Sequence, residues 1–450
     1  MEQDLKRTDK EATESRDVAQ RIEEISPIDA ASIMTDLPAQ QAANVAEYLD
    51  PTTAASILSN MDAALAATVI SDMEMPEASV LLEKMDPDDR VDILAHVTGP
   101  LHDELVGEMN EEHADEVRQL EQYSPDTAGG IMTTEVTALY EYITVDDAIT
   151  LLKRLNEELE QMFYVYVIDR RKHLVGVLSM RDLILARPDK RLRDIMIPNV
   201  RSVPATMDQE HVANLMRKYR YLAMPVVDAD KKLIGLITLD DIVQVMQDEA
   251  TEDVQKMFGA GAEERLTSPW HLSFRKRVVW LEVNLATAFA AAGVVSFFTD
   301  TIAALPILAA YQTIVSGMGG NAGAQAMAVA IRGIAVGEAQ GDVLKKVLRR
   351  EFMVGLCSGL VIGITTAIIA MVFNRSQQGI LVGVVVCIAL ILNHINACVT
   401  GVTVPFVMKR LGFDPAQSAT IFATTFTDCG GFFACLGLAK IAIAYLGIHA

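Results

Sequence analysis

One carboxylate stands near the middle of a long apolar segment close to the carboxyl end of the sequence. This residue, Asp428, belongs to the run 424–431, which begins with Thr424 and ends in two glycines. An ionisable group at mid-membrane depth is costly unless it faces a pore, a partner or water. A buried ion pair is the alternative, but Lys440 lies near the end of the segment and His394 carries little charge. We therefore expect Asp428 to be an ion ligand in a pore.

A second group of polar residues lies in another apolar segment. Asn321 and Gln325 are four residues apart, so a helix places both on one face. Gly320 and the neighbouring glycines permit close approach of another backbone. Amide oxygens at such a place can order the water shell of a passing ion, whereas hydrogen bonding between packed helices is the alternative interpretation.

Five segments are apolar enough to span roughly 30 Å of hydrocarbon, which takes about 20 helical residues. They are residues 278–299, 301–331, 352–373, 379–408 and 419–446. Lys and Arg gather before the first segment and after the second and fourth, and such residues favour the cytosolic side. We expect a multi-pass protein of the cell (inner) membrane whose amino terminus lies in the cytosol and whose carboxyl terminus lies outside.

The whole net charge of −22 belongs to the first 130 residues. They hold 8 Lys and Arg against 30 Asp and Glu, whereas the rest of the chain holds 30 of each kind. A phosphate backbone would be repelled by such a surface, which argues against nucleic acid as a partner. Cations are the natural counterpart of this domain.

An apolar residue followed by a turn residue recurs every 12 residues from Ile25 to Pro87. The short apolar segments between these positions are expected to be helices that bury their faces by stacking. The pattern predicts an all-α superhelical domain over residues 1–130, with an ordinary amphipathic bundle as the alternative. The breaker-rich stretch 123–130 ends it.

Residues 131–256 change to a pattern typical of strands. Two apolar runs, 163–168 and 174–179, flank a polar turn and precede a helix, and the pattern returns at 224–227 and 233–238. The two β-α-β-β-α units resemble a tandem cystathionine-β-synthase (CBS) pair. That resemblance implies a site for ATP or another adenine nucleotide, although many such pairs bind none. Its hydroxyl and ribose-carboxylate positions would be Ser179, Asp182, Thr238 and Asp241.

Together these parts resemble the MgtE family of magnesium channels over nearly the whole chain. The motifs that carry the resemblance are Gly-Gly-Asn-x-Gly-x-Gln at 319–325, Asp-Pro-Ala at 414–416, Ala-Thr-x-x-x-Asp at 423–428 and Glu-Ala-Thr-Glu-Asp at 249–253. It implies a multidomain fold that joins the all-α superhelical domain and the α/β tandem CBS pair to an all-α polytopic membrane domain. The expected boundaries are 1–130, 131–256, a connecting helix over 257–274, and five transmembrane helices within 275–450.

The resemblance also implies a homodimer in the lipid bilayer, with one pore on its two-fold axis and Mg²⁺ as the permeant ion. The expected pore residues are Asp428, Asn321, Gln325, Gly320 and Thr424. Regulatory Mg²⁺ is expected at Asp88, Asp92, Asp241, Glu249, Glu252, Asp253 and Asp414. An acidic position of the family is Arg220 here, which puts at least one regulatory site in question.

The chemistry of Mg²⁺ agrees with this interpretation. The ion prefers octahedral oxygen ligands and gives up water reluctantly, so a pore with few carboxylates and several amide or carbonyl oxygens suits its hydrated form. Divalent ions that bridge mutually repelling carboxylates favour a compact state. We therefore expect intracellular Mg²⁺ to close the pore.

Motifs of the competing functions are absent from the sequence. It has no His-Glu-x-x-His motif for a zinc protease and no Gly-x-x-x-x-Gly-Lys-Ser/Thr loop for a nucleotide-driven pump, so we do not expect an enzyme. The remaining alternative is a secondary transporter of another divalent cation or small solute that nucleotide regulates through the CBS pair. Both a channel and a carrier are compatible with the sequence.

Overall fold

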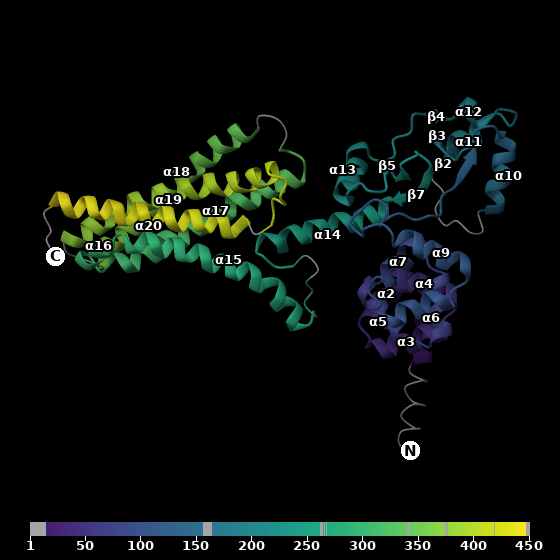
Figure 1. Ribbon diagram of the computed structural model, residues 1–450, viewed down its shortest axis with the longest axis horizontal. Helices are drawn as coiled ribbons and strands as arrows, with labels where there is room; N and C mark the ends of the chain where they lie inside the picture. Colours follow the sequence, from purple (N-terminus) through teal and green to yellow (C-terminus); the bar gives the residue numbers. More distant parts are fainter. Residues whose placement is uncertain are drawn as a thin grey trace, which may run out of the picture. The chain divides into compact units, whose positions relative to one another are not determined.

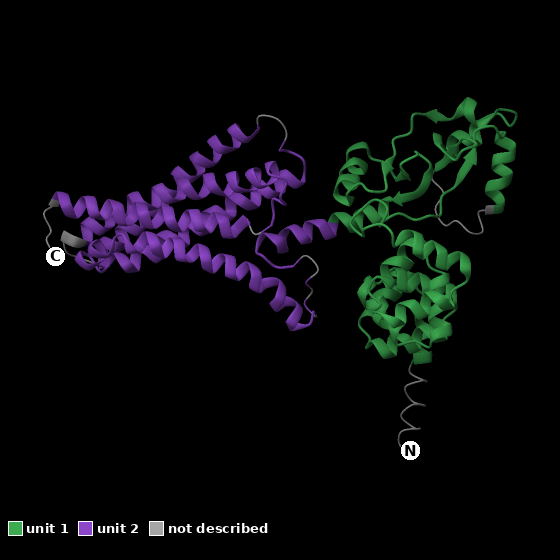
Figure 2. Cartoon of the chain, viewed as in Figure 1, with its two compact units in different colours: residues 1–246 green, residues 247–450 purple. Residues whose placement is uncertain are grey.

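The computed structural model describes residues 15–155, 164–261, 264, 266, 268–339, 343–373, 377–417 and 419–446. The chain forms two compact units, residues 1–246 and residues 247–450 (Figure 2). The first unit contains the acidic helical domain and the CBS pair. The second contains the long apolar helices.

Short helices of regular spacing build the amino-terminal part (Figure 1). Those from α2 to α7 begin 12 residues apart, as the repeat predicts, because a proline or a capping side chain starts most of them. The carboxylates of Asp50 and Asp62, for example, accept hydrogen bonds from backbone N–H groups of the helices that follow them. The bounds are Pro27–Thr35 (α2), Ala39–Tyr48 (α3), Pro51–Ser59 (α4), Ala63–Ser71 (α5), Met75–Glu83 (α6), Pro87–Leu94 (α7), Pro100–Glu108 (α8) and Glu111–Leu120 (α9).

These helices form two interleaved columns. Helix α2 packs on α4, α4 on α6 and α6 on α8, while α3 packs on α5, α5 on α7 and α7 on α9. Their buried faces are rich in alanine, as at Ala42, Ala43, Ala54 and Ala55, which allows short helices to approach closely. The arrangement confirms the predicted all-α superhelical domain.

The CBS pair contains two small sheets built in the same way (Figure 1). In each sheet a short strand runs parallel to the first strand of a hairpin, and both hairpins have an irregularity at the equivalent step, between Val167 and Ile168 and between Val226 and Val227. Both predicted hairpins are confirmed, apart from Phe163, which lies outside the described residues.

The first repeat comprises Ala138–Tyr140 (β1), Val145–Leu155 (α10), Tyr164–Ile168 (β2), Leu174–Ser179 (β3), Met180–Leu185 (α11), Leu192–Ile195 (α12) and Ile197–Pro198 (β4). The second comprises Val203–Pro204 (β5), Gln209–Tyr219 (α13), Ala223–Val227 (β6), Leu233–Thr238 (β7) and Leu239–Met257 (α14). Helix α13 ends at Tyr219, and the residue that caps it, Arg220, adopts a left-handed conformation with φ of 57°.

Long helices make up the second unit. They are Trp270–Ser296 (α15), Leu308–Ala335 (α17), Val343–Phe373 (α18), Gln377–Arg410 (α19) and Ala419–Leu446 (α20), with the short helix Thr299–Ala304 (α16) between the first two. Helix α19 packs against α17, α18 and α20, and α17 also packs against α20. Among the described residues, α15, α18, α19 and α20 are apolar and long enough to cross a membrane. Helix α17 has a comparable length of 28 residues but carries several glycines and amides.

Two predicted helices differ from those observed. The span predicted over 301–331 is interrupted, because Pro306 separates α16 from α17 and a proline cannot continue the hydrogen bonding of a helix. The helix that leaves the CBS pair lies earlier than the predicted range 257–274. Helix α14 ends at Met257 and is followed by Gly259, whose φ of 76° is usual for a residue that ends a helix.

Candidate ion pathway and cation sites

Asp428 is half-buried on α20 and faces α17. The hydroxyl of Ser316, on α17, donates a hydrogen bond to Oδ1 of Asp428. One turn beyond Ser316, Gly320 faces open space, since a Cβ added there would meet nothing within 4 Å. Ser316 was not among the predicted pore residues, because it lies 112 positions from Asp428 in the sequence and serine is common in membrane helices.

The other predicted pore residues lie on the same two helices. Asn321 and Gln325 are exposed on α17, and Thr424 is exposed on α20, where its hydroxyl donates to the carbonyl of Thr420. The two helices pack closely beside them, with Gly323 on α17 close to Thr427 on α20 (3.6 Å from a Cβ built on Gly323 to Cγ2). Within the described residues, no hydrogen bond joins these three side chains to Asp428.

Two asparagines of α19 contact the same pair of helices. Nδ2 of Asn393 donates to the carbonyl of Val315 on α17 at 2.8 Å, and Nδ2 of Asn396 donates to the carbonyl of Phe426 on α20 at 2.9 Å. Asn393 is 1% exposed, and its Oδ1 has no hydrogen-bond partner in the described structure. These residues were also missed, although an Asn-x-x-Asn spacing in an apolar helix is a signal that sequence reasoning can use.

The cations that could neutralise Asp428 lie elsewhere. Nζ of Lys440 lies 5.9 Å from the ring centre of Phe298, and Nδ1 of His394 contacts the carbonyl of Leu390 in its own helix at 2.9 Å. Among the described residues, Asp428 makes no salt bridge. Its carboxylate therefore has a hydroxyl partner and retains capacity for further ligands.

Aspartates from two helices gather in the first unit. Asp88, Asp89 and Asp92 lie on α7, and Asp241 lies in the first turn of α14. Burial raises the pKa of Asp89 to about 7 and that of Asp92 to about 6, and the negative charge of Asp241 contributes to both shifts. Burial also raises the pKa of Asp88 and of Asp241 above their usual range.

This aspartate cluster fits a divalent cation by its chemistry. Oδ1 of Asp88 is buried without a hydrogen-bond partner in the described part of the chain, so it can accept a ligand. A cation would also offset the mutual repulsion of the carboxylates. Asp89 was not among the predicted ligands, because sequence alone did not show which face of α7 it occupies.

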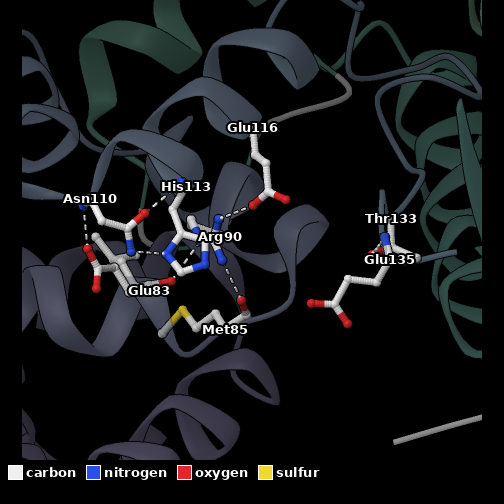
Figure 3. A network of polar contacts seen from close by, with 9 residues as sticks. Glu83, Met85, Arg90, Asn110, His113, Glu116, Thr133 and Glu135 are labelled. Atoms are coloured by element: carbon white, nitrogen blue, oxygen red, sulfur yellow. Dashed lines mark hydrogen bonds and ion pairs between the residues drawn. The ribbon is translucent and has the colours of Figure 1, made fainter. Parts of the chain in front are cut away.

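Arg90 holds α7 in place. Its guanidinium is buried, with Nε donating to the carbonyl of Leu82 at 2.7 Å and Nη2 donating to that of Met85 at 2.9 Å, while Nη1 pairs with Glu116 of α9 at 3.2 Å (Figure 3). A buried charge is tolerated when it is paired and hydrogen-bonded in this way. Arg90 thus fixes the helix that carries Asp88, Asp89 and Asp92.

Two of the predicted regulatory carboxylates in the second unit share a lysine. Nζ of Lys256 pairs with Glu252, one turn earlier on α14, and lies 3.0 Å from Oδ2 of Asp414 in the loop after α19. Burial alone would lower the pKa of Lys256, but the two carboxylates raise it above its usual value. This lysine holds the two carboxylates together.

The end of α14 is also tied to the helix that carries Asp428. The hydroxyl of Thr420, in the first turn of α20, donates to the carbonyl of Met257 at 2.6 Å. The remaining predicted ligands, Glu249 and Asp253, lie on the same α14. The end of α14 and the start of α20 are thus joined by a hydrogen bond.

A cavity of about 350 Å³ lies within the CBS pair. Thr137 and Tyr164 from the first repeat and Thr238 and Asp240 from the second are among the residues that line it. Of the predicted nucleotide residues, Thr238 lines the cavity, whereas Ser179, Asp182 and Asp241 are not part of its lining. The Ser179 hydroxyl donates to Asp182 at 2.6 Å, and the Thr238 hydroxyl donates to Asp241.

As the described side chains stand, no three His, Cys, Asp or Glu residues are close enough to hold a metal ion. The aspartate cluster on α7 and α14 would therefore have to contract around a cation or bind it through water. Mg²⁺ usually keeps several waters when it binds protein carboxylates, so direct contact by every carboxylate is not required.

Family models match the amino-terminal domain, the CBS pair and most of the membrane helices. Residues 312–438 match MgtE, described as a divalent cation transporter, residues 25–126 match the MgtE intracellular N domain, and residues 128–189 and 192–248 match CBS domains. The magnesium transporter MgtE of Bacillus subtilis is 32% identical over 95% of this chain and 94% of its own length. That of Enterococcus faecalis is 35% identical over 74% of this chain and 73% of its own length.

Among solved structures, the cytosolic domain of the Mg²⁺ channel MgtE in complex with ATP is 34% identical to this chain. It covers 50% of this chain and 93% of its own length, with a TM-score of 0.49.

Proposed function

Because the chain belongs to the MgtE family and is thus a multi-pass membrane transporter of Mg²⁺, we propose that the ion passes along α17 and α20 and is selected at Asp428. The observation that carries this proposal is the state of the Asp428 carboxylate. It is half-buried in an apolar helix, accepts a hydrogen bond from Ser316 and makes no salt bridge within the described residues. A carboxylate placed in this way is stabilised by a passing cation.

A homodimer would complete the pore. Asn321, Gln325 and Thr424 are exposed in the single chain, and polar side chains are costly against lipid. A second copy facing this surface across a two-fold axis would enclose them and bring two Asp428 carboxylates to one ion. Amide and hydroxyl oxygens on the same helices would then contact its hydration shell.

The soluble domains belong in the cytosol in this proposal. The segments that flank the apolar helices carry Arg275, Lys276 and Arg277 before α15, and Lys409 and Arg410 at the end of α19, and such residues favour the cytosolic side. The carboxyl terminus then lies outside the cell. Cytosolic Mg²⁺ therefore reaches the acidic domain.

Regulation follows from two groups of carboxylates. We assign the first to the aspartate cluster of α7 and α14, and the second to Glu249, Glu252, Asp253 and Asp414 around the connection to the membrane helices. Mg²⁺ bound at these groups would reduce carboxylate repulsion and favour the compact, closed state, because a ligand stabilises the conformation that it binds best. Transport would then decrease as cytosolic Mg²⁺ rises.

The CBS cavity is our candidate site for ATP or another adenine nucleotide. Tyr164 supplies an aromatic surface, and Thr238 supplies a hydroxyl from the repeated hydroxyl–carboxylate pair. The carboxylate of that pair, Asp241, also belongs to the aspartate cluster. A nucleotide that contacts Thr238 would therefore influence the first regulatory group.

The central test neutralises Asp428. Purified Asp428→Asn protein in vesicles should fold and insert normally but lose selectivity for Mg²⁺ over Ca²⁺ by about tenfold or more, equivalent to about 1.4 kcal/mol. Glu351→Gln is a matched control, because Glu351 is a buried carboxylate of α18 outside the proposed pathway, and this variant should transport normally. Unchanged selectivity in Asp428→Asn at equal protein content would refute Asp428 as the selecting ligand.

A further inference from the structure

Helix α19 reaches both proposed pore helices through side-chain amides one turn apart. Asn393 binds the carbonyl of Val315 on α17 and Asn396 binds the carbonyl of Phe426 on α20, at 2.8 and 2.9 Å. Backbone carbonyls inside a helix are normally used by the helix itself, so access from a neighbouring helix needs a particular local geometry.

Glycine provides that access at both contacts. A side chain in a helix leans toward the amino terminus and covers the preceding turn, so the residue four positions after a carbonyl can block it. Four positions after Val315 stands Gly319, and four after Phe426 stands Gly430. A Cβ on Gly319 would clash with Nδ2 of Asn393, and one on Gly430 would lie 2.6 Å from Nδ2 of Asn396. Each asparagine is therefore matched to a glycine on the helix that it contacts.

The two accepted carbonyls flank the proposed ion site. Val315 immediately precedes Ser316, and Phe426 lies two residues before Asp428. Given the proposed function, we propose that Asn393 and Asn396 are positioning residues that hold α17 and α20 in the register at which Ser316 meets Asp428, and so determine ion selectivity.

The unsatisfied oxygen of Asn393 supports a role beyond packing. Leaving a buried polar atom without a partner is destabilising, and Oδ1 of Asn393 is such an atom among the described residues. An apolar side chain of similar volume, such as leucine, would fill the space without that cost. The hydrogen bond from Nδ2 to the Val315 carbonyl explains why an amide stands at this position, since an apolar residue cannot make it.

Paired substitutions separate positioning from packing. Asn393→Ala should lower Mg²⁺ over Ca²⁺ selectivity by roughly fivefold, as expected for loss of one buried hydrogen bond, while Mg²⁺ uptake persists. Gly319→Ala should do the same, because its methyl group displaces the amide. In the double variant Gly319→Ala/Asn393→Ala, the methyl group refills the space, so the thermal midpoint should recover while selectivity stays low. Recovery of selectivity in the double variant would overturn the proposal.

The second contact gives an independent measurement. Asn396→Ala and Gly430→Ala, alone and together, should follow the same pattern. Because Asn396 is less buried than Asn393, its substitution should destabilise the fold less. Thr403→Val is the control on the same helix, since the Thr403 hydroxyl donates at 2.7 Å to the carbonyl of Val399 in α19 itself. Its selectivity should equal that of the unmodified protein. A loss in this control equal to that of Asn396→Ala would also overturn the proposal.

A further pair of variants keeps this inference distinct from the proposed function. If Asn393 positions Ser316, the effects of Asn393→Ala and Ser316→Ala on the thermal midpoint should be non-additive, whatever ion Asp428 selects. Additive effects would refute the positioning role even if Asp428→Asn loses selectivity. Conversely, normal selectivity in Asp428→Asn together with non-additive effects would refute the proposed ion site and leave the contact between helices established.

Discussion

Asp428 and Asp88 have different surroundings, and these suit the two different roles that we propose for them. Asp428 lies beside a hydroxyl that can orient its carboxylate, which suits an ion that binds and leaves. Asp88 lies among other aspartates, and burial and their charges raise its pKa. A carboxylate in that state gains most from a cation that stays bound.

The raised pKa values of Asp89 and Asp92 predict linkage between Mg²⁺ and protons. An unfolded aspartate has a pKa of about 4, whereas these folded values are about 7 and about 6. Between about pH 4 and about pH 7, the folded domain therefore holds more protons than the unfolded chain. Its free energy of unfolding without divalent cations consequently falls as pH rises over that range.

In the proposed regulation Mg²⁺ binds the ionised carboxylates, so its binding at pH 6 should release protons. Its affinity should rise with pH, by up to about tenfold per pH unit for one displaced proton. Calorimetric titration of the full chain in buffers of different ionisation enthalpy measures this release. It should be small at pH 8 and should decrease in Asp89→Asn/Asp92→Asn. Equal proton release in that variant would show that other groups are linked to Mg²⁺.

For single residues, the sequence predicts which side chains belong to the candidate site better than it predicts which other residues they contact. Asp428 stands out because a carboxylate is rare in an apolar segment, and Asn321 and Gln325 follow from helical spacing alone. The partner of Asp428 does not follow, since Ser316 is brought to it by packing of helices distant in sequence. The same holds for Asn393, whose contact depends on the missing side chain of Gly319.

Among the helices, α14 leaves the CBS pair and contacts the membrane helices through the side chain of Lys256, which pairs with Asp414, and the carbonyl of Met257, which accepts from Thr420 on the proposed pore helix α20. A lysine between Glu252 and Asp414 already compensates part of their charge. A divalent cation that binds these two carboxylates must therefore displace or share the ammonium group.

Removal of that ammonium should increase sensitivity to Mg²⁺. In Lys256→Met, the uncompensated carboxylates should bind Mg²⁺ more tightly, and the Mg²⁺ concentration that half-closes the pore should fall by roughly twofold to fivefold, in line with partly exposed ion pairs. Patch recording on the cytosolic side measures it, and Lys256→Arg should behave like the unmodified protein. An increased closing concentration in Lys256→Met would mean that the lysine itself stabilises the closed state.

Helix boundaries follow from sequence where the chain carries a clear start signal. The 12-residue spacing from α2 to α7 is predictable because Pro and Asp recur at the beginnings of helices. In the membrane part, apolar composition conceals the break between α16 and α17, since the flanking residues are as apolar as the helices. Pro306 is the local signal that would have located it.

For the molecule as a whole, the charge distribution predicts the effect of removing the amino-terminal domain. Deletion of residues 1–130 removes carboxylates that repel one another, but also removes Asp88, Asp89 and Asp92. Exposed repulsion is screened within roughly 8 Å at physiological salt, whereas a cation at 100 times its Kd stabilises the state that binds it by about 2.7 kcal/mol. The loss of binding groups should therefore dominate.

The shortened protein should remain open at higher cytosolic Mg²⁺ than the full chain. Neutralising Glu249, Glu252 and Asp253 together should shift closure further in the same direction. Patch recordings on both proteins at matched expression test this. A closing concentration that is unchanged or lower after deletion would assign Mg²⁺ sensing to the remaining domains.

The two interleaved columns of the amino-terminal domain also constrain how its length can evolve. Loss of one internal 12-residue unit would join helices of different columns across the deletion, so that loss of α4, for example, would bring α2 onto α5. Loss or gain of two units leaves each remaining helix in its own column, because α3, α5, α7 and α9 alternate with α2, α4, α6 and α8. Insertions and deletions upstream of α7 should therefore survive selection chiefly as pairs of units.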